Sequence, residues 1–221
     1  IGPDTRDHLG NAVAIAPKAA FAEGLGSLSG KRVIIDRPSA VQAVTDRLTA
    51  AGADVVAGED PTMLPKACKN PVEVQGSRSA HVRDGAAVSR FLAWLDRTAG
   101  DGSVDEMMAA DRLEAFRREN DLIRDLSFDT ISGSGPNGAI VHYRVTPETN
   151  RNLLPGELFL VDSGAQYLDG TTDITRTIAI GTPTAEMRDR FTRVLQGHLA
   201  LATVRFPKGT TGSQLDRKST R

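Results

Sequence analysis

The sequence predicts a mixed α/β (α+β) fold, and two observations lead to this class. First, a strand over 32–36, a helix over 39–51 and a strand over 54–57 follow one another, which is the pattern of an α/β unit. Second, amphipathic helical patterns over 72–97 and 104–119 precede β-branched segments that read as a hairpin. We therefore expect an α/β segment followed by a larger domain of helices and strands.

The two long helices are predicted from their apolar spacing. Residues over 72–97 place apolar side chains at helical intervals, and we interpret them as a core stripe. The helix over 104–119 follows Ser103, and the spacing of Ser103 and Glu106 fits a capping box. Both helices should therefore pack against the strands that follow them.

Proline positions divide the chain into two parts. Three prolines between residues 61 and 71 predict a linker over 61–71. Residues 1–60 then belong to a first domain, and residues 72–221 belong to a second one. Within the second domain, a strand is expected over 139–143 after a Gly-Pro-Asn-Gly turn, and an amphipathic helix is expected over 185–204.

The composition limits the classes of partner. The chain has 27 Lys and Arg against 28 Asp and Glu, a balance that favours neither a nucleic-acid nor a membrane partner. No apolar run approaches the roughly 20 residues that cross a bilayer. The single cysteine, Cys68, has no second cysteine for an internal disulfide. We therefore expect a cytoplasmic protein that binds neither nucleic acid nor membranes.

Two carboxylates, Asp162 and Asp173, lie on what read as adjacent strands. Apolar and β-branched runs over 158–161 and 175–180 flank a segment rich in Gly, Asp and Thr, which is typical of a hairpin. The two aspartates are therefore the first candidates for a metal site.

The turn of this hairpin decides whether the aspartates can act together. If Asp169 and Gly170 form a two-residue turn, Asp162 lies opposite Thr177, and Asp173 is roughly 13 Å away along the strand. If instead a four-residue loop over 166–169 closes the hairpin, Asp162 lies directly opposite Asp173, and the two are about 5 Å apart on one face. Only the second register serves a single metal centre.

Carboxylates that are this close repel each other unless one is protonated or a cation lies between them. Oxygen ligands suit divalent ions such as Mn, Co or Zn, and paired ions about 3.5 to 4 Å apart are a known hydrolytic device. The alternative from the residues alone is that Asp162 ends a strand, Asp173 belongs to a turn, and both are solvated.

Two longer strings resemble a known family. VDSGAQYLDGTTDITRT and DTISGSGPNGAIVHYRVTPETNRNL are similar to segments of Xaa-Pro aminopeptidases, the aminopeptidase P group of the creatinase, prolidase and methionine aminopeptidase superfamily. The likeness covers most of residues 60–216. It implies a pita-bread catalytic domain over 72–221 that is C-terminally incomplete, preceded over 1–60 by the remnant of a creatinase N-terminal-type α/β domain.

The resemblance also implies a function and its residues. It makes Asp162 and Asp173 metal ligands, which selects the register that sets them opposite each other, and it makes His142 a catalytic and substrate-binding residue. The implied cofactors are two divalent metal ions, manganese first and zinc or cobalt next. The implied substrates are peptides with proline at the second position, whose first residue is released by a metal-bridged water. Family members often pair, so a homodimer is a possible assembly.

The chain also departs from the family pattern. The family's remaining metal ligands, a histidine and two glutamates, fall downstream of residue 221, and His198 on the last predicted helix reads as a packing or surface residue. We therefore expect this chain by itself to bind metal only weakly or partially and to be a poor enzyme. Two alternatives are a non-catalytic pita-bread protein that binds peptides and a metal-free, creatinase-like amidine hydrolase; the aspartate pair argues against both.

Overall fold

The computed structural model describes residues 2–219 and contains two compact units that divide between Asn70 and Pro71. In the first unit, strands β1 and β2 pair in parallel, and helix α3 connects them. The segment predicted as a linker contains the short helix α4. The elements of this unit are α1 (Pro3–Leu9), η1 (Gly10–Ala12), η2 (Lys18–Ala20), α2 (Phe21–Gly26), β1 (Arg32–Ile35), α3 (Gln42–Ala50), β2 (Asp54–Ala57) and α4 (Met63–Ala67).

The second unit begins with two long helices and continues with strands. Both helices occur where the apolar spacing predicts them, and so does the long helix near the end of the chain. Across the described residues, no helix is both long enough and apolar enough to span a bilayer. The elements are α5 (Pro71–Thr98), η3 (Ala99–Asp101), α6 (Glu106–Arg118), β3 (Ile123–Leu126), β4 (Ile131–Ser134), η4 (Gly135–Ala139), β5 (Leu158–Ser163), β6 (Ala165–Tyr167), β7 (Gly170–Thr171), β8 (Ile174–Ala179), α7 (Ala185–Thr203) and α8 (Gly212–Ser219).

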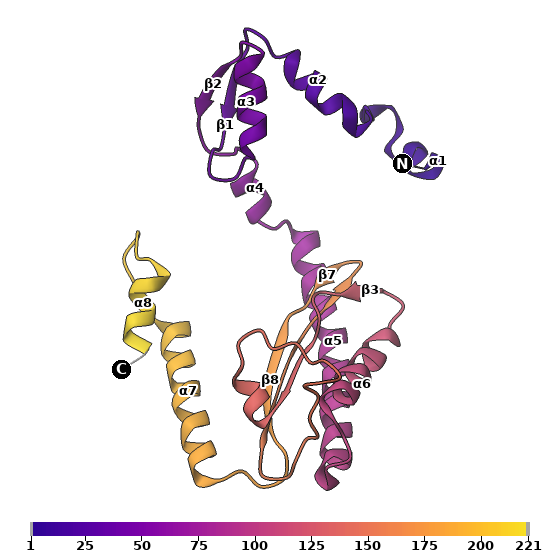
Figure 1. Cartoon of the computed structure of the whole chain (residues 1–221), viewed down its shortest axis with the longest axis vertical. Helices are drawn as coiled ribbons and strands as arrows, with labels where there is room; N and C mark the ends of the chain where they lie inside the picture. The colour runs from indigo at the N-terminus through magenta and orange to yellow at the C-terminus, as the bar shows by residue number, and fades with distance from the viewer. Residues whose placement is uncertain (1, 220–221) are drawn as a thin grey trace. The chain divides into compact units, whose positions relative to one another are not determined.

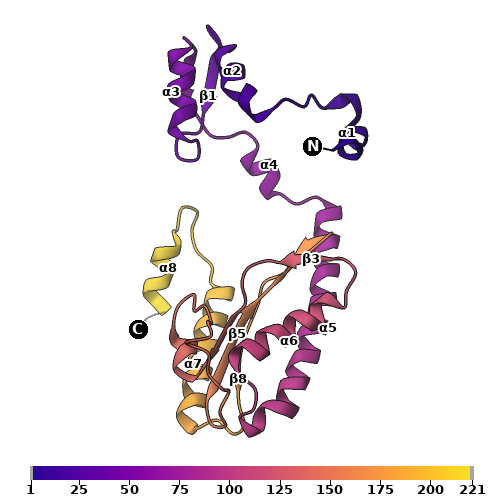
Figure 2. The same ribbon diagram turned by 45° about the vertical axis from the view of Figure 1, so that its right-hand side comes forward.

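An antiparallel sheet with the strand order β4-β5-β8 forms the centre of this unit, and helices α5 and α6 lie side by side against one of its faces (Figures 1 and 2). Side chains of β5 alternate between the two faces, as a strand requires. Phe159 and Val161 are buried in the core with Phe91 of α5 and Leu113 of α6. The intervening β5 residues, including Asp162, therefore project from the opposite face.

The strands β5 to β8 form one long hairpin, and its register differs from the prediction. Asp162 pairs with Thr175 rather than with Asp173, and Tyr167 pairs with Gly170 across a turn at Leu168 and Asp169. Neither register considered from the sequence is therefore correct.

Contacts with α5 explain why the Asp-Gly pair does not form the turn. Gly170 does not have the positive φ of a primed turn. It is small because α5 lies against it: a Cβ built on Gly170 would stand 3.0 Å from the Cα of Ser77 and 3.1 Å from the Cβ of Ala80. Gly76 meets the hairpin in the same way, since a Cβ there would lie 2.2 Å from the carbonyl oxygen of Asp169. Packing against α5, not local turn preference, therefore sets the register.

A buried ion pair ties the hairpin to both helices. Asp84 of α5 and Arg117 of α6 have side chains with no exposed surface. Arg117 donates from Nε to Oδ1 at 2.7 Å and from Nη2 to Oδ2 at 3.1 Å. The hydroxyl of Tyr167 donates to Oδ1 of Asp84 at 2.9 Å. Burial and the adjacent Asp84 carboxylate raise the pKa of Tyr167, so its hydroxyl keeps the proton that it donates.

Two local predictions are wrong. Residues 139–143 do not form a strand; the chain leaves β4, enters the 3-10 helix η4 and then turns. Gly135, with a φ of 52°, and Pro136 after it start η4 and end the strand. The cap of α6 is Asp105, which accepts from the amide of Met108 at 2.7 Å, and not Ser103, which donates to Asp101 instead.

The close contact of α5 with the hairpin predicts opposite outcomes for one substitution at two sites of the helix. Gly76→Ala should destabilise the chain because its methyl group would overlap the backbone of Asp169. Gly85→Ala should stabilise it by about 0.5–1 kcal/mol, because a Cβ at Gly85 meets nothing within 4 Å and alanine favours a helix. Urea unfolding of both variants measures the difference. Equal effects of the same sign would contradict the packing described here.

The buried ion pair makes a second prediction. Asp84→Ala leaves the guanidinium of Arg117 buried without its partner, which should cost about 3–5 kcal/mol in the free energy of unfolding. Tyr167→Phe removes one hydrogen bond to the same carboxylate and serves as the mild comparison, with an expected cost near 1–3 kcal/mol. Urea unfolding followed by circular dichroism measures both. An Asp84→Ala variant no less stable than Tyr167→Phe would show that the pair does not hold these elements together.

Candidate metal centre

Asp162 lies on the face of the sheet opposite to helices α5 and α6. It is half-buried on β5, and Thr175 is its partner on β8. The hydroxyl of Thr175 donates to Oδ1 of Asp162 at 2.8 Å. This contact leaves the second carboxylate oxygen of Asp162 and the remaining lone pairs of Oδ1 available to a ligand.

Asp173 lies on the same face, one residue before β8 begins. Asp173 and Thr175 are exposed, whereas Thr172 before them is fully buried and Ile174 between them packs against the core. Because Thr175 is the direct partner of Asp162, Asp173 occupies the diagonal position, at about 7–8 Å by general strand geometry. By this register Asp173 stands diagonally to Asp162 and not directly opposite it, as had been expected, and the role of the two aspartates as metal ligands stays a prediction.

Close backbone contacts at Gly164 fix the part of the hairpin that lies between Asp162 and Asp173. A Cβ on Gly164 would stand 2.0 Å from the carbonyl oxygen of Thr172 and 2.2 Å from the hydroxyl of Ser127, so only glycine fits. Thr172 also accepts from the amide of Ala165 through its hydroxyl at 3.0 Å, and its own amide donates to the carbonyl of Ala165 at 2.9 Å. The register between Asp162 and Asp173 is thus fixed by buried contacts.

The two carboxylates fit part of a site for a divalent ion. They offer oxygen ligands from adjacent strands, which hard and borderline ions accept. Among the residues that the structure describes, no group of three or more His, Cys, Asp and Glu side chains could hold a metal ion. The pair therefore suits one side of a metal centre and does not complete one.

His142 is exposed and follows η4 in a turn. The amide of Tyr143 donates to the carbonyl of Ile140 at 3.2 Å, and His142 has a φ of 55°, the only positive φ of a non-glycine residue in the described part of the chain. A Cβ on Gly138 of η4 would lie 3.5 Å from the Cβ of Leu160, which alternates with the core residues of β5. The segment before His142 therefore covers the same face that carries Asp162; the role of His142 stays a prediction.

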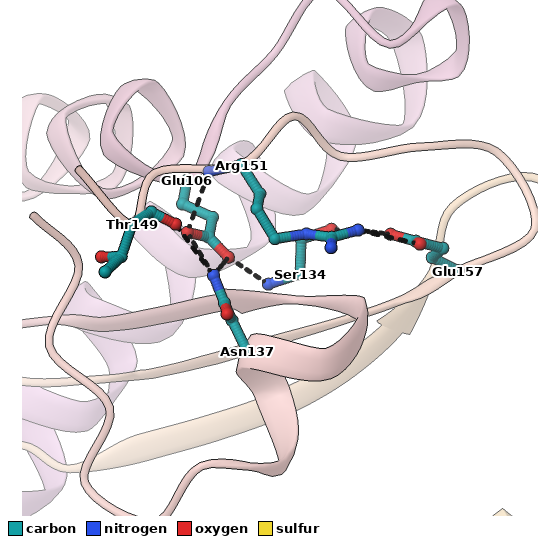
Figure 3. A network of polar contacts seen from close by, with 6 residues as sticks. All are labelled: Glu106, Ser134, Asn137, Thr149, Arg151 and Glu157. Atoms are coloured by element: carbon teal, nitrogen blue, oxygen red, sulfur yellow. Dashed lines mark hydrogen bonds and ion pairs between the residues drawn. The ribbon is translucent and has the colours of Figure 1, made fainter. Parts of the chain in front are cut away.

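A buried carboxylate, Glu106, for which the sequence predicts only a capping role, organises this region (Figure 3). Glu106, the first residue of α6, has no exposed surface. Its Oε1 accepts from the amide of Ser134 at 2.6 Å and from Nδ2 of Asn137 at 3.0 Å. Its Oε2 accepts from the hydroxyl of Tyr143 at 2.9 Å and from the amide of Arg151 at 3.2 Å. In the sequence, a glutamate at the start of a helix indicates only a capping residue. Its hydrogen bonds to residues 134–151 could not be inferred from the sequence.

A second carboxylate continues the network at its edge. Arg151 donates from Nη2 to both carboxylate oxygens of Glu157 at 3.0 Å, and Figure 3 shows this pair pointing away from Glu106. The guanidinium of Arg151 thus neutralises Glu157 rather than Glu106. Every hydrogen bond that Glu106 receives comes from an uncharged group.

Models of two protein families match the chain. Residues 75–221 match metallopeptidase family M24, and residues 1–73 match the creatinase/prolidase N-terminal domain. The predicted fold class, a creatinase-type N-terminal domain followed by part of a pita-bread domain, is confirmed.

Curated relatives are similar over almost all of the chain. A probable Xaa-Pro aminopeptidase P from Laccaria bicolor is 48% identical over 96% of this chain and 34% of its own length. Aminopeptidase P2 from Arabidopsis thaliana is 39% identical over 96% of this chain and 34% of its own length. The chain therefore spans about a third of the length of these relatives.

Solved structures agree with the sequence matches. X-prolyl aminopeptidase from Caenorhabditis elegans, described as a cytosolic enzyme with a di-nuclear active site, has a TM-score of 0.85 and 32% identity, and the match covers 99% of this chain and 37% of the worm chain. Prolidase from Pyrococcus furiosus shares the fold, with a TM-score of 0.66 and 22% identity over 90% of this chain and 56% of its own. Because the model of metallopeptidase family M24 matches residues 75–221, which is more than half of the chain, the chain belongs to this family.

Proposed function

We propose that this chain is part of a metal-dependent aminopeptidase that releases an N-terminal residue preceding proline. The observation that supports the proposal is the register of β5 and β8, which sets Asp173 diagonally to Asp162 within the part of the chain that matches family M24. Relatives named as Xaa-Pro aminopeptidases support the choice of bond. The proposal concerns the activity of a protein of the relatives' length, of which this chain covers about a third.

In this proposal Asp162 and Asp173 hold two divalent metal ions, with manganese the first candidate and zinc or cobalt the next. Such ions supply Lewis acidity and lower the pKa of a bound water. Thr175 orients Asp162 by donating to its Oδ1 and thereby presents the other oxygen outward. His142 contacts the substrate and steadies the charge that develops on the scissile carbonyl.

The proposed substrates are peptides with proline at the second position. Proline lacks a backbone N–H and fixes its own φ, so an Xaa-Pro bond presents a shape that an ordinary peptidase site does not accept. The proposed location is the cytoplasm, which agrees with the description of the worm relative as cytosolic. A homodimer is the proposed assembly.

Metal binding by the 221-residue chain gives the first test. Two carboxylates without further ligands should hold one Mn²⁺ per chain weakly, with a Kd on the order of 10⁻⁴ to 10⁻³ M. Asp162→Asn should weaken this binding about tenfold or more, because it removes one of two charged ligands. Isothermal titration calorimetry measures both values, and Asp189→Asn on the exposed face of α7 is the matched control. Tight binding of two ions, or equal binding by the Asp162→Asn variant, would contradict the proposed ligands.

Peptide hydrolysis gives the second test. The chain is extended with the downstream region of the Laccaria bicolor relative, and release of glycine from a Gly-Pro peptide is measured with Mn²⁺ present. We expect cleavage that a chelator abolishes, and a loss of kcat of about 10²-fold or more in Asp162→Asn, while Asp189→Asn retains activity. His142→Ala should lower kcat about 10²-fold by removing a group beside the developing charge. An extended protein that binds Mn²⁺ but cleaves no Xaa-Pro bond would refute the proposed function.

A further inference from the structure

We propose that Glu106 is a positioning residue for His142, acting through the segment 134–151. The inference rests on the proposed function only in assigning His142 to the substrate. It begins with a feature that the metal centre does not explain: a glutamate with no exposed surface whose hydrogen-bond partners are all uncharged. Burying a carboxylate without a cation is costly, so the arrangement requires that its hydrogen bonds be made.

The donors to Glu106 come from both ends and the middle of one segment. Ser134 ends β4, Asn137 lies in η4, Tyr143 lies beyond it, and Arg151 lies at the far end. The main chain adds to this closure, because the amide of Glu106 donates to the carbonyl of Arg151 at 2.9 Å. A single side chain therefore closes a long, irregular segment that would otherwise retain much conformational freedom.

Tyr143 links this closure directly to His142. It is the next residue along the chain, it is buried, and its hydroxyl reaches Oε2 of Glu106 at 2.9 Å. The oxygen of the same hydroxyl accepts from Nδ2 of Asn137 at 2.8 Å, which joins Tyr143 to η4. Tyr143 is thus fixed on one side of His142, and η4 is fixed on the other side through Asn137.

The backbone of His142 shows why such fixing is needed. Its positive φ is unfavourable for a residue with a Cβ, and conformations of this kind persist where the surroundings determine them. The Ile140–Tyr143 turn holds His142 exposed beside η4, which covers the face that carries Asp162. Releasing Glu106 would let this turn relax and move the imidazole away from that position.

The test uses the 221-residue chain and does not depend on catalysis. The Glu106→Gln substitution replaces one carboxylate oxygen with an NH₂ group. This group cannot accept the hydrogen bonds that the oxygen accepted, because it is itself a donor. We expect the backbone amides of Ser134 and Arg151 to exchange with solvent about tenfold faster or more, because each donates to the carboxylate. We also expect the imidazole NMR signal of His142 to move toward its position in the unfolded chain, while the signal of His81, whose ring bonds the carbonyl of Ser77 on α5, stays in place.

Two further variants complete the design. Tyr143→Phe keeps the carboxylate and removes one donor beside His142, so it tests the link even where Glu106→Gln prevents folding; it should move the His142 signal as well. Glu119→Gln makes the same chemical change at an exposed pair with Arg90 and should leave the His142 signal unchanged. A His142 signal that is the same in Glu106→Gln, or in a folded Tyr143→Phe, as in the parent chain would overturn the inference.

A kinetic readout separates this inference from the proposed function. In the extended protein, Glu106→Gln should lower kcat about tenfold while KM changes less than about twofold, since a displaced catalytic group affects the reaction more than binding. An unchanged kcat would overturn the positioning role. If the extended parent protein cleaves no Xaa-Pro peptide while the His142 signal responds as described, the proposed function fails and the positioning of His142 by Glu106 stands.

Discussion

The buried ion pair between Asp84 and Arg117 is the constraint on which the hairpin between β5 and β8 depends. Removing either charge would leave the other buried in the core without a partner, so the ion pair holds α5 and α6 in one arrangement. Tyr167 adds the hairpin to this arrangement by donating to the same carboxylate. Asp169 at the turn pairs with Arg83, and the guanidinium of Arg83 lies 5.4 Å from the ring centroid of Tyr167. The far end of the hairpin is therefore fixed on α5 through polar contacts as well as close packing.

Glu106 acts in a related way on a different sheet: Asp84 bonds to the β3-β6-β7 sheet, and Glu106 bonds to the β4-β5-β8 sheet. Asp84 fixes β6 through a side-chain hydroxyl, whereas Glu106 fixes the edge strand β4 through the amide of Ser134. Both acids belong to the helices that cover one face of the sheet, and both are fully buried. Asp162 and Asp173 lie on the other face, half-buried and exposed respectively. The unit thus separates carboxylates that hold the fold from carboxylates that remain free to bind a ligand.

Sequence patterns predict the elements that depend on local spacing. The long helices, the two strands of the first unit, the strand that carries Asp162 and the strand that follows Asp173 are predicted by periodicity and β-branched runs. The register could not be predicted, because Gly170 looked like a turn residue and is instead a close contact for α5. The false strand over 139–143 has a similar cause: its apolar residues suggested a strand, but Asn137 and Tyr143 bond to Glu106 from a distant part of the chain. Long-range contacts of this kind leave no local pattern.

The observed register gives the proposed metal centre a different spacing of carboxylates from that of a directly opposed pair. Opposed residues bring carboxylates about 5 Å apart, which crowds both around one position, whereas diagonal neighbours about 7–8 Å apart leave more room between them. Paired ions about 3.5–4 Å apart need that room, because each must be reached by a carboxylate without the two carboxylates repelling each other at close range. The diagonal arrangement arises because the turn forms at Leu168 and Asp169, and that turn is set by glycines packing on α5. The spacing of the candidate ligands is therefore determined by contacts at the far end of the hairpin.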